Sequence, residues 1–111
     1  MKEGEIILAN LPQSDRNFKL RPLLVLKQLP GVNDYLVCGI STQLHHLVKD
    51  FDELIDEKTS HFSQTGLRQS SIIRLGFLAV IPGNKIPGSI GRINTSFHQK
   101  LLERLAKYLT G

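Results

Sequence analysis

Residues 21–43 of the chain are RPLLVLKQLPGVNDYLVCGISTQ. Two apolar runs, residues 23–26 and 35–40, are separated by a segment whose Pro, Gly, Asn and Asp residues at 30–34 are typical of a turn. The second run is rich in residues that favour strands. Pro22 opens the first run, and because proline cannot donate to a sheet ladder, we expect it at a strand start or at a sheet edge. The segment therefore predicts two strands joined by a turn.

Short apolar segments with turn residues between them continue along the rest of the chain. We predict further strands at 5–9, 51–55, 69–75, 77–81 and 89–93, an exposed loop at 13–20 and a brief helical turn at 44–49. Gly76 is expected to separate the strand at 69–75 from the one that follows it. Many short strands with turns between them favour a small antiparallel barrel over alternating β and α units.

The C-terminal segment changes to a helical period. Its apolar residues recur at spacings that line one stripe of a helix, namely Phe97, Leu101, Leu102, Leu105, Tyr108 and Leu109. Asn94, Thr95 or Ser96 can cap the start of this helix, and Gly111 can end it. We expect the stripe to cover one side of the barrel. A helix lying on a membrane surface is disfavoured by Glu103 and by the mixed charges of the polar face.

Length and composition limit the class of protein. The chain has 111 residues, of which 41% are apolar, so it can bury one small core and we expect a single domain over residues 1–111. Its one cysteine, Cys38, has no partner for an intramolecular disulfide, which favours a reducing compartment. The longest apolar run, residues 77–81, is far shorter than the roughly 20 residues of a membrane helix, and the first residues do not have a signal-peptide pattern. We therefore expect a cytoplasmic protein with no membrane partner.

Charge is distributed unevenly along the sequence. The formal net charge is +4, yet residues 50–59 carry five acids and one base, whereas residues 60–111 carry seven bases and one acid. A fold that brings the C-terminal half beside Arg16, Lys19 and Arg21 would present a positive surface that attracts phosphates. The alternative is that these charges only solvate the surface.

Patterns for metal and cofactor binding are missing from the sequence. His45 and His46 are adjacent, so their side chains diverge, and His61 and His98 are isolated. There is no glycine-rich phosphate loop and no nucleophile elbow. We therefore expect neither a metal nor a cofactor.

Four features follow one another over nearly the whole chain. They are Gly4-Glu5 before the first strand, Arg21-Pro22 before the second, Ile40-Ser41-Thr42-Gln43 at the end of the third, and the C-terminal amphipathic helix. In this order and spacing the sequence resembles the PemK/MazF family of toxins from bacterial toxin–antitoxin pairs. The resemblance implies a mainly β fold, a small SH3-like antiparallel barrel with the helix appended. It also implies a homodimer that cuts single-stranded RNA without a metal and is silenced by a cognate antitoxin.

The resemblance also assigns site residues. The family's catalytic arginine directly precedes the proline and corresponds to Arg21, and its catalytic threonine corresponds to Ser41, which keeps the hydroxyl and lacks the methyl group. Basic and polar side chains near these two are expected to contact the RNA, namely Arg16, Lys19, Thr42, Gln43 and Arg74.

The chemistry of RNA cleavage suits such residues. RNA carries its own nucleophile, the 2′-hydroxyl, so cleavage requires removal of that proton, stabilisation of the charge on the phosphate oxygens and a proton for the leaving 5′-oxygen. A guanidinium can bind two phosphate oxygens at once and stabilises charge that develops in the transition state. We expect Arg21 to do this and Ser41 to hydrogen-bond the phosphate or orient the leaving oxygen. The general base is left unassigned.

One position departs from the family pattern. Some members carry an arginine and, two residues later, an aspartate on the strand that corresponds to residues 71–75. Arg74 matches the first position, and Gly76 occupies the second. A second hypothesis is therefore a non-catalytic SH3-like module that binds nucleic acid or a partner protein.

The candidate residues also have purely structural alternatives. Arg21 could pair with Asp15 or with an acid at 50–57, and Ser41 could satisfy backbone groups in a turn, as could its neighbour Thr42. Arg74 could form an ion pair at the edge of the core.

Overall fold

The structure is a computed structural model that describes residues 3–12 and 18–111, without the side chains of residues 11, 12, 18 and 19. The described elements are, in chain order, β1 (Glu5–Pro12), β2 (Phe18–Gln28), β3 (Asp34–Ser41), the 3-10 helix η1 (Leu44–His46), β4 (Glu53–Ile55), α1 (Phe62–Thr65), β5 (Ser71–Pro82), the 3-10 helix η2 (Gly83–Lys85), β6 (Gly88–Arg92) and α2 (Thr95–Thr110). Most of these elements agree with the sequence predictions, although β1, β2 and β3 are longer than expected. The predicted loop at 13–20 is wrong at residues 18–20, which belong to β2, and residues 13–17 lie outside the described residues.

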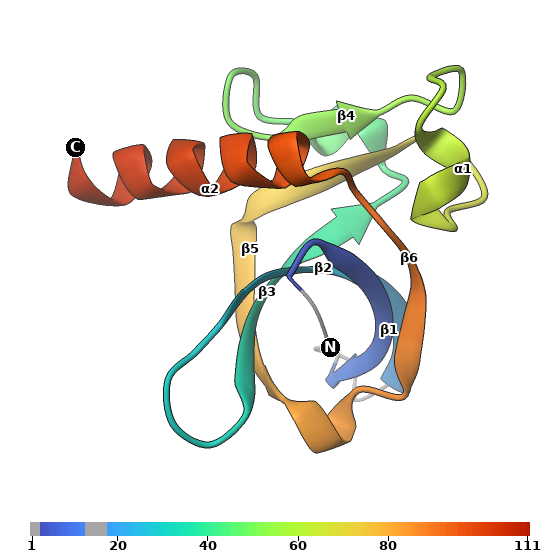
Figure 1. Ribbon diagram of the computed structural model, residues 1–111. Coiled ribbons are helices and arrows are strands. Elements are labelled where there is room, and N and C mark those ends of the chain that lie inside the picture. Colours follow the sequence, from blue (N-terminus) through green and yellow to red (C-terminus); the bar gives the residue numbers. More distant parts are fainter. Residues whose placement is uncertain (1–2, 13–17) are drawn as a thin grey trace.

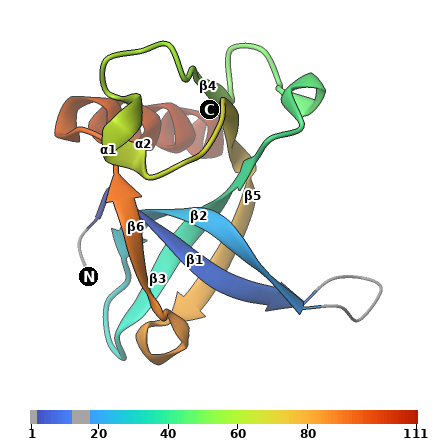
Figure 2. The ribbon, with the colours of Figure 1, turned by 90° about the vertical axis from the view of Figure 1, so that its right-hand side faces the viewer.

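The strands form one antiparallel sheet in the order β4-β5-β3-β2-β1-β6. Figure 1 shows that this sheet curls into a half-barrel and that α2 lies along one side of it. In Figure 2 the β1–β2 hairpin extends away from α1 and α2. The mainly β fold with a C-terminal helix is thereby confirmed, and the SH3-like character of the barrel stays a prediction.

The central strands are buried on both faces of the sheet. Along β2, Leu24 and Leu26 pack into the core that includes Leu101 of α2, whereas Leu23 and Val25 pack into a second core on the opposite face. Successive side chains of a strand point to opposite faces. A strand buried on both faces therefore needs a continuous apolar run, and this explains why residues 23–26 show no polar alternation.

The C-terminal helix begins as the sequence predicts. The Asn94 side-chain oxygen accepts a hydrogen bond from the Phe97 backbone N–H at 2.7 Å, which is a typical N-cap. Leu101 and Leu105 are buried. Leu109 is 67% exposed because the last turns of α2 project past the sheet, so the predicted stripe is only partly covered.

The prediction of two separate strands around Gly76 is wrong. β5 is one strand that pairs with β3 along its length, but Cys38 lies opposite Leu78 while the next residue, Gly39, lies opposite Arg74. Residues 75–77 therefore form a bulge. Glycine marks a bulge in a strand as readily as a break, and here the sequence alone did not distinguish the two.

Pro22 lies inside β2 and not at the start of the strand. It pairs with Leu8 of β1, whereas pairing between β2 and β3 ends at the Leu23 and Gly39 pair. Proline has no N–H to donate to a further strand. At Pro22 the side of β2 that faces away from β1 is a sheet edge, as expected. Beyond this point β2 has a neighbour on one side only.

The α1 helix was missed, because its four residues are too few to show a helical period. It ends at Gly66, whose backbone has φ +73° and whose place beside the Ile90 carbonyl leaves no room for a side chain. Within the described residues, no helix is long and apolar enough to cross a membrane.

Candidate active site

A cleft of about 460 Å³ opens where β2 and β3 stop pairing. Its walls come from β2, from the end of β3 with the turn that follows it, and from β5. The lining residues are Arg21, Pro22, Leu23, Gly39, Ile40, Ser41, Thr42, Gln43, His46, Arg74 and Phe77. Five of the seven predicted site residues thus share one cleft. The other two, Arg16 and the Lys19 side chain, lie outside the described residues.

Arg21 is exposed and enters the cleft from β2. Within residues 3–12 and 18–111 the ion pairs are Lys27 with Glu3 and Arg104 with Glu53, so Arg21 does not pair with any described acid. Its suggested partners at 50–57 are therefore wrong, and Asp15 lies outside the described residues. The guanidinium is available to an anion in the cleft.

Ser41 ends β3 and lies at the turn into η1. Its Oγ accepts a hydrogen bond from the Gln43 N–H at 3.0 Å, so the expected structural role in a turn is confirmed. This bond uses a lone pair of the hydroxyl and leaves its proton to be donated. The turn role and a phosphate contact are thus compatible, and the same turn brings Thr42 and Gln43 to the cleft wall.

The β5 bulge shapes the opposite wall. Arg74 is half-buried without an ion pair to any described acid, and its guanidinium carbon lies 5.9 Å from the centre of the Phe77 ring. Phe77 is 45% exposed, and a Cβ on Gly39 would lie 2.9 Å from its ring. Glycine at position 39 therefore makes room for the Phe77 ring over β3. The sequence indicates Phe77 as the first residue of an apolar strand and does not place it in the site.

Asp52 links the segment after η1 to the β5 bulge by hydrogen bonds. This buried carboxylate accepts the Val48 N–H at 2.9 Å on one oxygen and the Leu75 N–H at 3.1 Å on the other. The first bond holds the segment after η1, and the second satisfies the N–H of a bulge residue. Nothing in the sequence distinguished Asp52 from the other acids at 50–57.

His46 is the one histidine of the described chain that lines this cleft. It is exposed at the end of η1, with its ring centre 4.2 Å from that of His45, so the expectation that these two side chains diverge is wrong. His98, by contrast, is buried and its Nε2 lies 2.8 Å from the Leu26 carbonyl oxygen, which is a structural role. The sequence indicates His46 only as half of an adjacent histidine pair that does not complete a metal site.

The charge of the cleft favours anions. Its described lining contains two guanidiniums, those of Arg21 and Arg74, and no carboxylate. Such a site attracts phosphates. Within the described residues, no group of three or more His, Cys, Asp or Glu side chains could hold a metal ion. Cys38 lies in the core, where burial raises the pKa of its thiol, so it takes no part in this chemistry.

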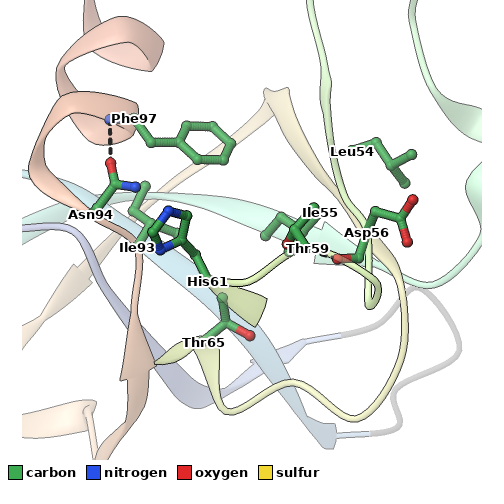
Figure 3. A pocket seen from close by; sticks show the side chains of 9 residues that line it. All are labelled: Leu54, Ile55, Asp56, Thr59, His61, Thr65, Ile93, Asn94 and Phe97. Atoms are coloured by element: carbon green, nitrogen blue, oxygen red, sulfur yellow. Dashed lines mark hydrogen bonds between the residues drawn. The ribbon is translucent and has the colours of Figure 1, made fainter. Parts of the chain in front are cut away.

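A second pocket, of about 200 Å³, lies where β4, α1 and the start of α2 meet. Figure 3 shows Phe97 and His61 on one side of it and Leu54 and Asp56 on the other. It contains none of the predicted site residues. Its volume is below the roughly 300–1,000 Å³ of most small-molecule sites.

The comparisons with known proteins identify the family and the fold of this chain. The model of the PemK-like, MazF-like toxins of type II toxin–antitoxin systems matches residues 2–109. The chain belongs to this family, and it is therefore a toxin of the endoribonuclease class that a cognate antitoxin neutralises. Comparison with curated protein sequences gave no significant match.

Solved structures show the same fold. Mycobacterium tuberculosis toxin MazF-mt6 superposes with a TM-score of 0.67 at 23% identity, over 96% of each chain. An endoribonuclease from a mycobacterial species, in complex with its cognate antitoxin, gives a TM-score of 0.70 at 10% identity, over 99% of this chain and 95% of that one. An Mtb toxin gives 0.56 at 23% identity, over 78% and 90%.

Proposed function

We propose that this chain is a metal-independent endoribonuclease that cleaves single-stranded RNA in the cytoplasm, acting as one domain whose active site is the cleft between β2 and β3. The observation that supports this proposal most is that Arg21 and Ser41 line the same cleft. They come from two different strands and have no carboxylate beside them among the described lining residues.

Each residue has a defined part in the proposed reaction. The Arg21 guanidinium binds the oxygens of the scissile phosphate and stabilises the charge that grows on them as the 2′-oxygen attacks. The Ser41 hydroxyl donates to the phosphate or to the leaving oxygen. Further contacts with the RNA come from Arg16, Lys19, Thr42, Gln43 and Arg74.

The test is to incubate the purified protein with a long single-stranded RNA in excess chelator. We expect discrete fragments that end in a 2′,3′-cyclic phosphate and a 5′-hydroxyl, since the 2′-oxygen is the nucleophile. RNA that stays intact at high protein concentration, or cleavage that the chelator abolishes, contradicts the proposal.

The second candidate is a module that binds RNA without cutting it. It is favoured by Gly76, which lies in the bulge of β5 and supplies no carboxylate where some family members carry one. The same incubation separates the two candidates. Retarded but intact RNA supports the binding module, whereas fragments support the enzyme.

The antitoxin is the expected protein partner of this chain. One structural neighbour is an endoribonuclease in complex with its cognate antitoxin. We propose that an acidic segment of the antitoxin covers the cleft, where Arg21 and Arg74 attract carboxylates as they do phosphates. An antitoxin that binds should then compete with RNA, and simultaneous binding of both contradicts this arrangement.

A homodimer is also part of the proposal. The pairing of β5 with β4 ends at Ile73, so the rest of this edge of β5 has no neighbouring strand among the described residues. Leu78 and Val80 lie in that part of the strand and are 40% and 54% exposed. An exposed apolar strand edge favours association with another chain. The molar mass by light scattering should be that of a dimer, and Val80→Asp should lower it to that of a monomer. A monomeric wild-type protein contradicts the proposal.

A further inference from the structure

The described cleft is rich in groups that donate protons in hydrogen bonds and poor in groups that remove them. Arg21 and Arg74 are donors only, and a guanidinium does not lose its proton in proteins. The hydroxyls of Ser41 and Thr42 are too weakly acidic and too weakly basic to act alone as a base near neutral pH. An imidazole is the side chain that exchanges protons between about pH 5 and 8, and His46 brings one to this cleft.

Two hydrogen bonds connect His46 to Ser41 through the backbone of Gln43. The Gln43 N–H donates to the Ser41 Oγ at 3.0 Å, and the Gln43 carbonyl accepts the His46 N–H at 3.0 Å. The Val48 N–H, two residues later, is held by the buried carboxylate of Asp52. His46 therefore stands on a turn that is fixed at both ends, and one of these ends is the hydroxyl proposed to contact the phosphate.

We propose that His46 is the general base of the reaction, an inference that rests on the proposed endoribonuclease function. The neutral imidazole accepts the proton of the 2′-hydroxyl while the 2′-oxygen forms its bond to phosphorus. The bond from phosphorus to the 5′-oxygen breaks, and that oxygen takes a proton from solvent. The products are a 2′,3′-cyclic phosphate and a 5′-hydroxyl, and the imidazolium returns its proton to solvent.

The charged surroundings of His46 are basic. Arg21 of β2 and Arg74 of β5 line the same cleft, and the His45 ring lies beside it on the same turn. No carboxylate is among the described lining residues, and Gly76 supplies none where some family members carry an aspartate, so His46 supplies the proton acceptor.

The test compares His46→Gln with His45→Gln, which removes an imidazole from the same turn but from a residue outside the cleft lining. Single-turnover cleavage of a short RNA is measured from pH 5 to 8.5 at saturating protein. We expect the wild-type rate to rise with pH, because only the neutral imidazole can accept the proton of the 2′-hydroxyl. H46Q should lose about 10²–10⁴-fold in rate and should lose this rise, whereas H45Q should keep both within a few-fold.

Two further measurements separate proton transfer from binding and folding. The affinity for a non-cleavable RNA with a 2′-deoxy nucleotide at the cleaved position should change less than about twofold in H46Q, because the base acts on the 2′-hydroxyl. Added imidazole should restore part of the activity of His46→Ala. A circular dichroism spectrum like that of the wild-type protein shows that the fold is kept.

The outcomes distinguish this proposal from the proposed function. If the wild-type protein and H46Q cleave RNA at the same rate with the same pH profile, His46 is not the base although the enzyme is confirmed. If Asp15→Asn, in the segment outside the described residues, is the variant that removes the rise with pH, the base lies there. Absence of cleavage by the wild-type protein overturns the proposed function and this proposal with it.

Discussion

Two hollows of the described surface differ in how their walls are built. The pocket of about 200 Å³ lies where β4, α1 and α2 pack against one another, and residues such as Leu54 and Phe97 line it. The cleft of about 460 Å³ lies where regular pairing is interrupted, at Pro22 on β2 and at the bulge of residues 75–77 on β5. Where the hydrogen bonds between two strands are interrupted, the strands separate and polar side chains can line the space between them.

The two hollows also differ in charge. Asp56 lies in the smaller pocket, whereas Arg21 and Arg74 lie in the cleft without a described carboxylate. If the residues that cleave RNA all lie in the cleft, substitutions in the cleft should change the rate of RNA cleavage and substitutions in the smaller pocket should not.

The largest effect is expected from Arg21→Ala. Removal of one positioned donor to developing charge typically costs 10²–10³-fold in rate, and we expect a loss of about 10³-fold here because the guanidinium can bind two phosphate oxygens. Since Arg21 is exposed and has no described ion pair, the thermal midpoint should hardly change. Arg92→Ala, at an exposed arginine of β6, is the control and should cleave like the wild-type protein. Equal rates for R21A and R92A contradict the assignment.

A smaller loss, of about 10²-fold, is expected from Ser41→Ala. This variant also leaves the Gln43 N–H without its acceptor, so the free energy of unfolding should fall by about 1 kcal/mol. Ser41→Thr keeps the hydroxyl and should stay within a few-fold of the wild-type rate. If alanine and threonine behave alike in single-turnover cleavage, the hydroxyl has no part in the reaction.

Asp52→Asn should affect the cleft indirectly. The amide keeps one acceptor and turns an NH₂ group toward a backbone N–H, so one of the two hydrogen bonds is lost at a cost of about 1–3 kcal/mol in unfolding free energy. The turn that carries His46 and the bulge would then shift relative to each other, and a loss of about tenfold in kcat is expected, because small misplacements are costly. Asp56→Asn, at the smaller pocket, should leave kcat unchanged. An unchanged kcat in D52N shows that the two walls do not need this link.

The smallest effect is expected in the smaller pocket. Leu54→Ala removes a side chain that is 45% exposed, so the unfolding free energy should change by less than about 1 kcal/mol and the cleavage rate by less than about twofold. A large loss of activity in L54A would show that the function extends beyond the cleft.

The sequence predicted the strands well where burial alone determines them. The run at 23–26 is apolar throughout because β2 is buried on both faces, and the turn residues at 30–34 end the two central strands as expected. The bulge around Gly76 was mistaken for a strand break because both interruptions use glycine. The four residues of α1 were too few for a periodic signal.

The sequence predicted part of the site. Arg21 and Ser41 belong to recognisable motifs and each lies two residues beyond the last pair of β2 with β3, Leu23 with Gly39, so their approach follows from this pairing. His46 and Phe77 reach the cleft through a 3-10 turn and a bulge, and the buried Asp52 links these two segments through its hydrogen bonds to Val48 and Leu75. These contacts depend on three-dimensional register, which a local pattern does not encode.

The most direct test of the central claim is a crystal structure of the protein with an RNA that carries a 2′-deoxy nucleotide at the cleaved position mapped in the long RNA. We predict that the scissile phosphate lies within hydrogen-bonding distance of both the Arg21 guanidinium and the Ser41 Oγ, with the His46 ring facing the 2′ position. A scissile phosphate bound on another face of the molecule, or one that contacts neither Arg21 nor Ser41, would contradict the claim.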